Sequence, residues 1–414
     1  MIWWQDDQSL PFPDELLQLA DTGERTADGA LYLVGQAGDS FLSEFPEARV
    51  AVDNGRYLVV SLTNDERAKA EQANSACFGV SPVPENSHVL RTVPAPLQAP
   101  TARSTITDLV SESELIASCT VLAGFRTRHS LSSEFTSASD WARTRLQSFG
   151  FAVATQTITV GGSPSSNLVA DKSGTGANRR LVIATAHLDS INISGGAGAP
   201  APGADDNASG SAGVVEIGRV LGPQSSENDL RLILFGGEEE GLHGSRQYVA
   251  ALTPADRARL DAVINMDMIG TLNVPAPTVL LEGAPVSQQL MNDLSDAANE
   301  YTSLTVQTSL NPFASDHVPF INAGLPALLT IEGSDSNNTS IHTANDTLDK
   351  VNGALAAQIV RMNVAVLARR LHLNDVPAAA LSAVGSAAAD LTGDQSADIV
   401  GFGDAGVWVS LNNG

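Results

Sequence analysis

Cysteine and basic residues are scarce in this chain of 414 residues. The two cysteines, Cys77 and Cys119, exclude a disulfide-rich framework and a CxxC metal site. They leave open either one disulfide or two small buried side chains. Lysine and arginine number 23 against 47 acidic residues, so the formal net charge is −24. This excess argues against nucleic acid and anionic membrane surfaces as partners, because both are bound through basic patches, and it favours cationic ligands such as metal ions or amines.

Long apolar runs are also missing, since no stretch approaches the roughly 20 residues that cross a bilayer. The first residues, MIWWQDDQ, lack the basic start and apolar core of a signal peptide. The composition nevertheless suits export. We therefore expect a secreted or periplasmic protein whose signal peptide is not present in this chain.

The length predicts two or three domains, because a single core rarely serves more than roughly 250–300 residues. The predicted order is a small α+β domain over 1–92, a Pro/Ala-rich linker over 93–104, a main domain over 105–373, an Ala-rich linker over 374–389 and a β tail over 390–414. Within the first domain, β-rich runs around Asp53-Asn54-Gly55 predict a hairpin over 49–62, and residues 63–74 are helix-prone.

The main domain alternates strand-like and helix-like segments. Strands are predicted within 181–190, 230–237, 261–270, 278–283 and 325–333, and helices are predicted within 207–222 and from Thr253-Pro254. This alternation indicates an α/β domain whose sheet is covered by helices on both faces. In such sheets, binding residues gather where strands end and loops begin.

Five places in this domain put a histidine or an acid just after an apolar strand or in a loop. They are His187 with Asp189, Asp205 with Asp206, Glu238 to Glu240, Asp267, and His342. Each alone has an ordinary explanation, namely a hydrogen-bonded histidine, a helix N-cap, a solvated acidic loop or an Asp–Arg pair. Because all five fall in one domain with few basic residues near them, we favour a functional site.

Two histidines and three carboxylates form a ligand set that suits a pair of Zn²⁺ ions with one carboxylate shared. Asp189, two residues from His187, is well placed to orient a ligating imidazole. A remaining glutamate is a candidate base for activating water. The HExxH, GxSxG and P-loop patterns are absent, so single-zinc HExxH, serine and nucleotide chemistries have no support.

The chain resembles the M28 zinc metallopeptidases of the aminopeptidase Y and Streptomyces–Aeromonas type. Six ordered motifs carry the resemblance: AHLDS (186–190), GADDNASG (203–210), GGEEEGLHGS (236–245), NMDMIG (265–270), SDH (315–317) and IHTANDTL (341–348). Together they cover most of residues 105–370. The resemblance implies a central mixed, largely parallel sheet flanked by helices, of the zinc-peptidase/phosphorylase type.

The resemblance also implies a role for each site residue. Metal ligands would be His187 and Asp267 for one zinc, Glu239 and His342 for the other, and Asp206 between the two. Catalytic residues would be Glu238, as general base, and Asp189; Asp316 and His317 would lie behind the ligands, and Glu240 would have no role. Some members place a tyrosine near the final histidine or ahead of SDH, whereas this chain has Ile341 and Phe313 there. No oxyanion-stabilising side chain is therefore predicted.

The implied function is that of a monomeric di-zinc aminopeptidase, which hydrolyses the N-terminal bond of peptides with a free N-terminus through a water held between the metals. A carboxypeptidase or dipeptidase on the same scaffold is the alternative, but it would need a basic residue for the substrate carboxylate. A glutaminyl cyclase normally uses one zinc. A non-catalytic binding relative would have lost ligands, and all five are retained here.

The glutamate run carries a prediction about the backbone. Neighbouring side chains of an extended strand face opposite ways. For Glu238 and Glu239 to serve one site as base and ligand, the chain must leave regular β geometry at Gly236-Gly237.

The tail resembles a single FG-GAP/VCBS-type repeat. Asp390, Asp394 and Asp398 recur in a Gly-containing stretch ahead of two short β-rich runs. Such spacing of oxygen ligands suits Ca²⁺, and a solvated turn explains it equally well. Both interpretations stay open.

Overall fold

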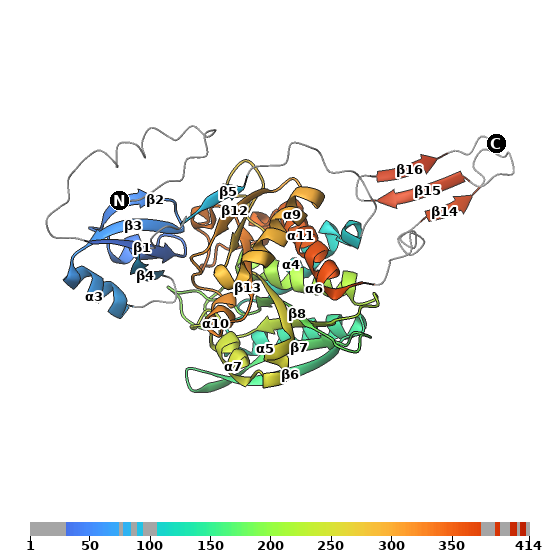
Figure 1. Ribbon diagram of the computed structural model, residues 1–414, viewed down its shortest axis with the longest axis horizontal. Helices are drawn as coiled ribbons and strands as arrows, with labels where there is room; N and C mark the ends of the chain where they lie inside the picture. The colour runs from blue at the N-terminus through green and yellow to red at the C-terminus, as the bar shows by residue number, and fades with distance from the viewer. Residues whose placement is uncertain are drawn as a thin grey trace.

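The computed structural model describes residues 30–73, 78–83, 89–93 and 106–373, together with the backbone of three strands between 386 and 410. Figure 1 shows an N-terminal unit beside a larger α/β unit. The N-terminal unit comprises β1 (Ala30–Gln36), α2 (Ser40–Glu44), β2 (Arg49–Asp53), β3 (Tyr57–Leu62), α3 (Asn64–Ala73) and β4 (Phe78–Pro82). It confirms the predicted hairpin, since β2 and β3 pair antiparallel around the turn.

The N-terminal sheet has the order β2-β3-β1-β4, and all of its neighbouring strands run antiparallel. Buried apolar side chains, among them Val34, Phe41, Leu58 and Phe78, form its own core. This core is small, and the partly buried Phe313 of the larger unit packs against it.

The larger unit is built on a nine-stranded sheet with the order β5-β12-β11-β13-β10-β8-β9-β7-β6. Its strands are β5 (Arg91–Val93), β6 (Ala152–Val160), β7 (Ser163–Lys172), β8 (Leu181–His187), β9 (Asp229–Phe235), β10 (Leu260–Met266), β11 (Thr278–Glu282), β12 (Thr305–Ser309) and β13 (Ala327–Glu332). The central strands β13, β10, β8 and β9 are parallel. Antiparallel strands complete both sides, so the predicted mixed sheet is confirmed.

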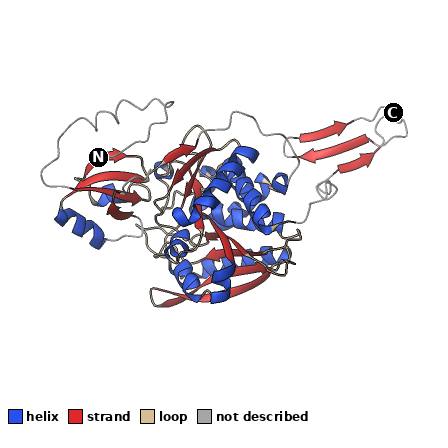
Figure 2. Cartoon of the chain, viewed as in Figure 1, coloured by secondary structure: helices blue, strands red, loops and turns tan. Residues whose placement is uncertain are grey.

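Helices cover both faces of this sheet, as Figure 2 illustrates. They are α4 (Glu112–Ala123), α5 (Ser133–Ser148), α6 (Gly210–Leu221), α7 (His243–Ala251), α8 (Pro254–Arg259), α9 (Gln288–Tyr301), α10 (His317–Asn322) and α11 (Gly353–Leu371). Alternate residues of β8 pack into different cores, with Val182 and Ala184 on one face and Leu181 and Ile183 on the other. The period-two pattern of a strand buried on both sides explains this division.

Short helical segments lie in the connections: η1 (Ile106–Leu109), the π-turn η2 (Ala204–Ser209), η3 (Pro285–Ser287), η4 (Asp335–Asn337) and η5 (Leu348–Lys350). The predicted start of α8 is confirmed, because the Thr253 side chain accepts a hydrogen bond from the Asp256 amide at 3.0 Å and Pro254 opens the helix. Within the described ranges, no helix combines the length and apolarity that a bilayer crossing requires.

Two strands lie across the predicted domain limits. Arg91–Val93 pairs antiparallel with β12, so the chain joins the large sheet at the limit predicted at residue 92. In the predicted Ala-rich linker, β14 (Ser386–Ala389) pairs with β15 (Asp398–Gly403), which pairs with β16 (Gly406–Ser410). Short extended segments pair through backbone groups, which composition does not reveal. The division into domains otherwise stays a prediction.

Three predictions concern residues whose side chains the structure does not describe. Cys77 lies outside the described residues, so its pairing with the buried Cys119 stays a prediction. Asp390 and Asp394 also lie outside them, and only the backbone of Asp398 is described, at the start of β15. The predicted calcium site therefore stays a prediction as well.

The central strand β10 should govern the stability of the larger unit. Ile264 is 0% exposed. Ile264→Ala should lower the free energy of unfolding by about 2–5 kcal/mol, because it leaves a cavity between packed layers. Urea unfolding monitored by circular dichroism measures the change. Val121→Ala, on the exposed side of α4, is the control and should stay within about 0.5 kcal/mol of the parent. Equal losses in both variants would contradict the assignment of this core.

Candidate metal centre

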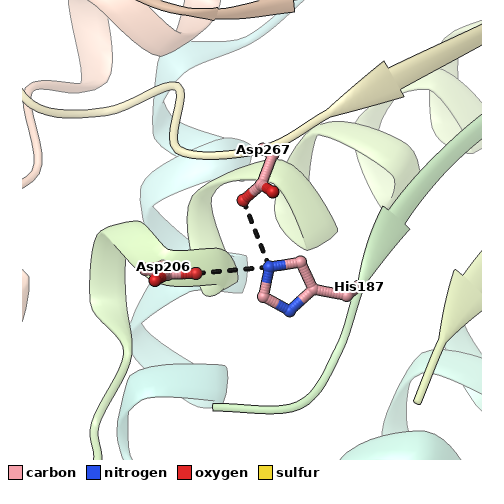
Figure 3. Close-up of side chains that lie close together, drawn as sticks. All are labelled: His187, Asp206 and Asp267. Atoms are coloured by element: carbon pink, nitrogen blue, oxygen red, sulfur yellow. Dashed lines mark hydrogen bonds and ion pairs between the residues drawn. The ribbon is translucent and has the colours of Figure 1, made fainter. Parts of the chain in front are cut away.

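Three side chains from different segments converge where the central strands end. His187 is the last residue of β8, Asp267 follows β10, and Asp206 lies in η2. The Nε2 atom of His187 is 3.1 Å from Asp267 Oδ1 and 3.2 Å from Asp206 Oδ1. Figure 3 shows both carboxylates directed at this nitrogen. Parallel strands bring their carboxyl ends to one edge, which explains the meeting of residues far apart in the chain.

A second group of ligand atoms adjoins the first. The Nε2 atom of His342 is 3.0 Å from Asp206 Oδ2 and 3.0 Å from Glu239 Oε2. Asp206 thus presents one oxygen to each histidine. The two groups, His187–Asp206–Asp267 and Asp206–Glu239–His342, share this single carboxylate.

The spacing of these atoms fits a metal ion in each group. Nitrogen and oxygen ligands about 2.0–2.1 Å from a tetrahedral Zn²⁺ lie about 3.3 Å from one another. The four distances of 3.0–3.2 Å between histidine nitrogens and carboxylate oxygens are close to that value. In addition, Glu239 Oε1 is buried and accepts no hydrogen bond from the described residues. The donor set is therefore suited to two borderline cations such as Zn²⁺.

The loop that carries Asp206 is held by buried hydrogen bonds. Both carboxylate oxygens of Asp346 accept backbone amides, one from Asp205 and one from Asp206, each at 2.9 Å. The Asn207 side chain donates to Met266 O at 3.0 Å, next to Asp267. These contacts tie η2 to the end of β10, so two ligands from distant segments keep one geometry.

The backbone leaves β geometry at the glutamates, as predicted. Strand β9 ends at Phe235, and Gly237 has a φ of 69°, a left-handed value that glycine adopts without strain. A Cβ on Gly236 would lie 2.6 Å from both the Phe135 ring and Ser166 O. The turn therefore needs both glycines, and it places Glu238 and Glu239 beside the same acidic site.

Asp189 lies behind His187 and also steadies the glutamate turn. Its Oδ1 atom is 3.6 Å from His187 Nδ1, while Nδ1 is 3.2 Å from the Asp189 carbonyl oxygen. Its Oδ2 atom accepts the backbone amide of Glu239 at 3.1 Å. One carboxylate thus links the segments that carry two ligands.

Asp316 and His317, which were predicted to lie together behind the ligands, make different contacts. Asp316 is fully buried, and its pKa is raised to about 7, chiefly by burial and also by the charges of Asp189 and Asp267, against the opposing effect of His187. His317 points elsewhere, with its Nε2 atom 3.3 Å from Glu282 Oε1. Between β12 and α10, Ser315 donates from its hydroxyl to Asp267 Oδ2 at 2.6 Å. Only its place in the SDH motif signalled this contact in the sequence.

Glu240 belongs to neither group of ligand atoms, yet its side chain is engaged. Its Oε1 atom accepts from the Ser130 hydroxyl at 2.8 Å and lies 3.2 Å from His129 Nε2. Burial and the charge of Asp189 raise the pKa of this carboxyl to about 8. Glu240 therefore makes a half-buried contact with the segment before α5, which no sequence motif marks. That Glu240 has no chemical role stays a prediction.

Crowded carboxylates dominate the electrostatics of the site. Burial and the charge of Asp206 raise the pKa of Glu239 to about 7. Burial also raises the pKa of Glu238 well above its usual value; the charges of Asp267 and Asp316 add to this, and the opposing effect of His187 does not cancel it. The pKa of Asp206 is lowered, because hydrogen bonds from His187 and His342 outweigh its burial. Such a site gains from added positive charge.

The comparison with known families agrees with this site. Residues 167–367 match Peptidase family M28, a range that holds all five ligand candidates and Glu238. The chain carries an M28 peptidase domain.

Curated relatives share this domain. Leupeptin-inactivating enzyme 1 of Streptomyces exfoliatus is 34% identical over 207 residues, 49% of this chain and 43% of the relative. Aminopeptidase YwaD of Bacillus subtilis is 32% identical over 174 residues, 41% of this chain and 37% of the relative. A probable zinc metalloprotease of Pyrenophora teres is 26% identical, covering 63% of this chain and 66% of the relative. The match thus spans less than half of the first two relatives.

Among solved structures, LapB from Legionella pneumophila superposes with a TM-score of 0.59 at 18% identity. The superposition covers 84% of this chain and all of LapB, at 100%. This likeness concerns the fold, which is the α/β architecture predicted from the motif order.

The acid-rich M28 site predicts an unusual pH dependence of stability without metal. An acid with a higher pKa in the folded than in the unfolded state binds more protons when folded, so stability falls as the pH rises between the two values. Asp316 and Glu239 have pKa values of about 7 against ordinary values of 3.8 and 4.5. The raised pKa of His187 acts in the same direction, because its contribution is complete below 6.5 and is lost at higher pH.

The melting temperature of chelator-treated protein should therefore fall from pH 5 to pH 8, and zinc should remove this fall by compensating the carboxylates. Differential scanning calorimetry with and without zinc measures both slopes. Asp316→Asn should reduce the slope of the metal-free protein, whereas the exposed Asp140→Asn should leave it unchanged. Equal slopes with and without zinc would contradict this account of the site.

Proposed function

We propose that this protein is a di-zinc aminopeptidase that hydrolyses the N-terminal bond of peptides. The observation that supports this most is Asp206, which offers one oxygen to each of two histidine–acid groups. Relatives named aminopeptidase and zinc metalloprotease share the domain, which supports both the metal and the reaction class. His187, Asp267, Glu239 and His342 would complete the two ligand sets.

A zinc pair held there would supply Lewis-acid polarisation of the scissile carbonyl and would lower the pKa of water. Glu238 would take the proton from the attacking water and pass it to the leaving amine. A carboxyl whose pKa lies well above its ordinary value is suited to both steps, since it can accept and release a proton near neutral pH. Asp189 would orient His187 and hold the Glu239 amide.

The charge of the site favours a substrate amine over a substrate carboxylate. A carboxypeptidase or dipeptidase would need an accessible cation beside the reacting bond. Among the described residues, the charge of Arg128 acts on Asp189 and Asp206, but this arginine is 0% exposed and donates to backbone carbonyls. An acidic, metal-lined site instead suits a free α-amino group, and the acidic composition suits an exported, monomeric enzyme.

Glu238→Gln should retain zinc and lose nearly all turnover, because the amide cannot accept the proton while the ligand atoms are untouched. We expect kcat to fall by about 10²–10⁴-fold, the usual contribution of a general base. Atomic absorption after dialysis reports bound zinc, and aminoacyl-p-nitroanilide hydrolysis reports kcat. Glu300→Gln, which is exposed on α9, is the matched control. A near-normal kcat for Glu238→Gln would refute the assignment.

Asp206→Ala should instead lose metal from both groups, because each group loses one oxygen of the carboxylate that they share. The metal content of this variant should fall to near zero, and parent protein treated with a chelator should behave in the same way until zinc is returned. A substrate series with free and acetylated N-termini, and with free and amidated C-termini, separates the alternatives. Cleavage that needs a free C-terminus, and not a free N-terminus, would favour a carboxypeptidase.

A further inference from the structure

The N-terminal unit contacts the larger unit through a buried arginine. Arg56 lies in the turn between β2 and β3 and is 5% exposed. Its Nε atom lies 2.8 Å from Glu282 Oε2, and its Nη1 atom lies 2.9 Å from Asp335 Oδ2. A third donor, Nη2, reaches Phe313 O at 3.1 Å, and the adjacent Tyr57 hydroxyl also donates to Glu282.

Both carboxylates are buried under the N-terminal unit, since Glu282 is 0% and Asp335 is 2% exposed. Despite burial, the charge of Arg56 holds the pKa of Glu282 at about 2. Two buried negative charges that lose their cation are strongly destabilising. Removing the N-terminal unit would therefore expose Glu282 and Asp335 without their cation and would destabilise the larger unit. A segment that detaches during activation would not be expected to leave such a surface.

Each carboxylate that pairs with Arg56 is connected to a segment that carries or holds a candidate metal ligand. Asp335 lies in η4, at the start of the segment that ends at His342. Glu282 lies 3.3 Å from His317 Nε2, two residues after the Ser315 whose hydroxyl holds Asp267. The guanidinium thus joins the two segments that position ligands of both groups.

Apolar contacts connect the N-terminal unit to the same segments of the metal centre. Leu33 and Tyr57 of the N-terminal unit share one buried cluster with Met268, the residue after Asp267, and Ile341, the residue before His342, packs against it. The contact is close, since a Cβ on Gly35 would lie 2.8 Å from the Phe313 ring and one on Gly55 would lie 1.9 Å from Ser336 Oγ. The two units therefore fit without space for a side chain at these glycines.

We infer that Arg56 is a positioning residue for the metal centre. We also infer that the N-terminal unit stays bound to the larger unit in the active protein. This inference rests on the proposed zinc site. The unit acts on His342 and Asp267 through the segments they belong to. An inhibitory segment that must leave before the site works would have the opposite effect on activity.

Arg56→Met tests this, with Arg49→Met at the exposed first position of β2 as control. Zinc affinity, measured by competition with a fluorescent chelator, should fall about 10-fold or more in Arg56→Met, as for other groups that orient ligands. On an aminoacyl-p-nitroanilide, kcat should fall while KM changes much less. Asp335→Asn keeps the pair with Glu282 and should show a smaller loss, which provides a test should Arg56→Met fail to fold. Parental zinc affinity and kcat in both variants would overturn the inference.

Cleavage of the intact chain at a protease site introduced within 94–105 gives an independent test. The N-terminal fragment should co-elute with the larger unit, and activity should persist. Release of the fragment with equal or greater activity would overturn the inference. Because zinc binding is measured directly, failure of the parent protein to bind zinc would refute the proposed function, whereas normal zinc affinity in Arg56→Met would refute only the role of Arg56.

Discussion

The structure depends on holding several carboxylates in one buried site although their like charges repel one another. Asp206 is the centre of this arrangement, because its two oxygens face different histidines at 3.2 and 3.0 Å. Buried carboxylates are costly unless hydrogen bonds or cations compensate them. For Asp206 the compensation comes from the imidazoles of His187 and His342, while the carboxylate of Asp346 accepts the backbone amides of Asp205 and Asp206 and so holds the turn. The rest of the fold serves to keep these partners in place.

The sheet does so through the ends of its parallel strands. His187 ends β8, and Asp267 and the glutamate turn follow β10 and β9; these three strands are neighbours in the order of the sheet. Each strand is buried on both faces, so its end cannot shift without disturbing both cores. The buried strands therefore fix the positions of the site residues, and the loops after the strands carry most of the reactive side chains. The sharp exit at Gly236 and Gly237 is where the regular frame gives way to the site.

Much of this could be predicted from the sequence, because strands, turn glycines and ordered motifs are local signals. The alternation of elements predicted the α/β fold, and the motifs nominated the residues that meet around Asp206. Several contacts that hold these residues in place were not predictable. Ser315 on Asp267, Asp346 beneath Asp206 and Ser130 on Glu240 depend on how loops pack. The contact of His317 with Glu282 at 3.3 Å depends on loop packing in the same way, and a role of His317 behind the ligands stays a prediction.

Two buried arginines show how charge is balanced without blocking the ligands. Arg128 donates to the carbonyl oxygens of Leu188 and Gly203, on either side of the site, and not to any carboxylate. Burial lowers its pKa to about 10, which keeps it charged at neutral pH, and its charge acts on Asp189 and Asp206 from a distance. A direct salt bridge would have occupied the oxygens that the proposed metal ions would need. Arg56 can pair directly with Glu282, because that carboxylate belongs to neither group of candidate ligand atoms. Arg128 thus compensates the charge of the candidate ligands without a direct ion pair, whereas Arg56 compensates Glu282 through one.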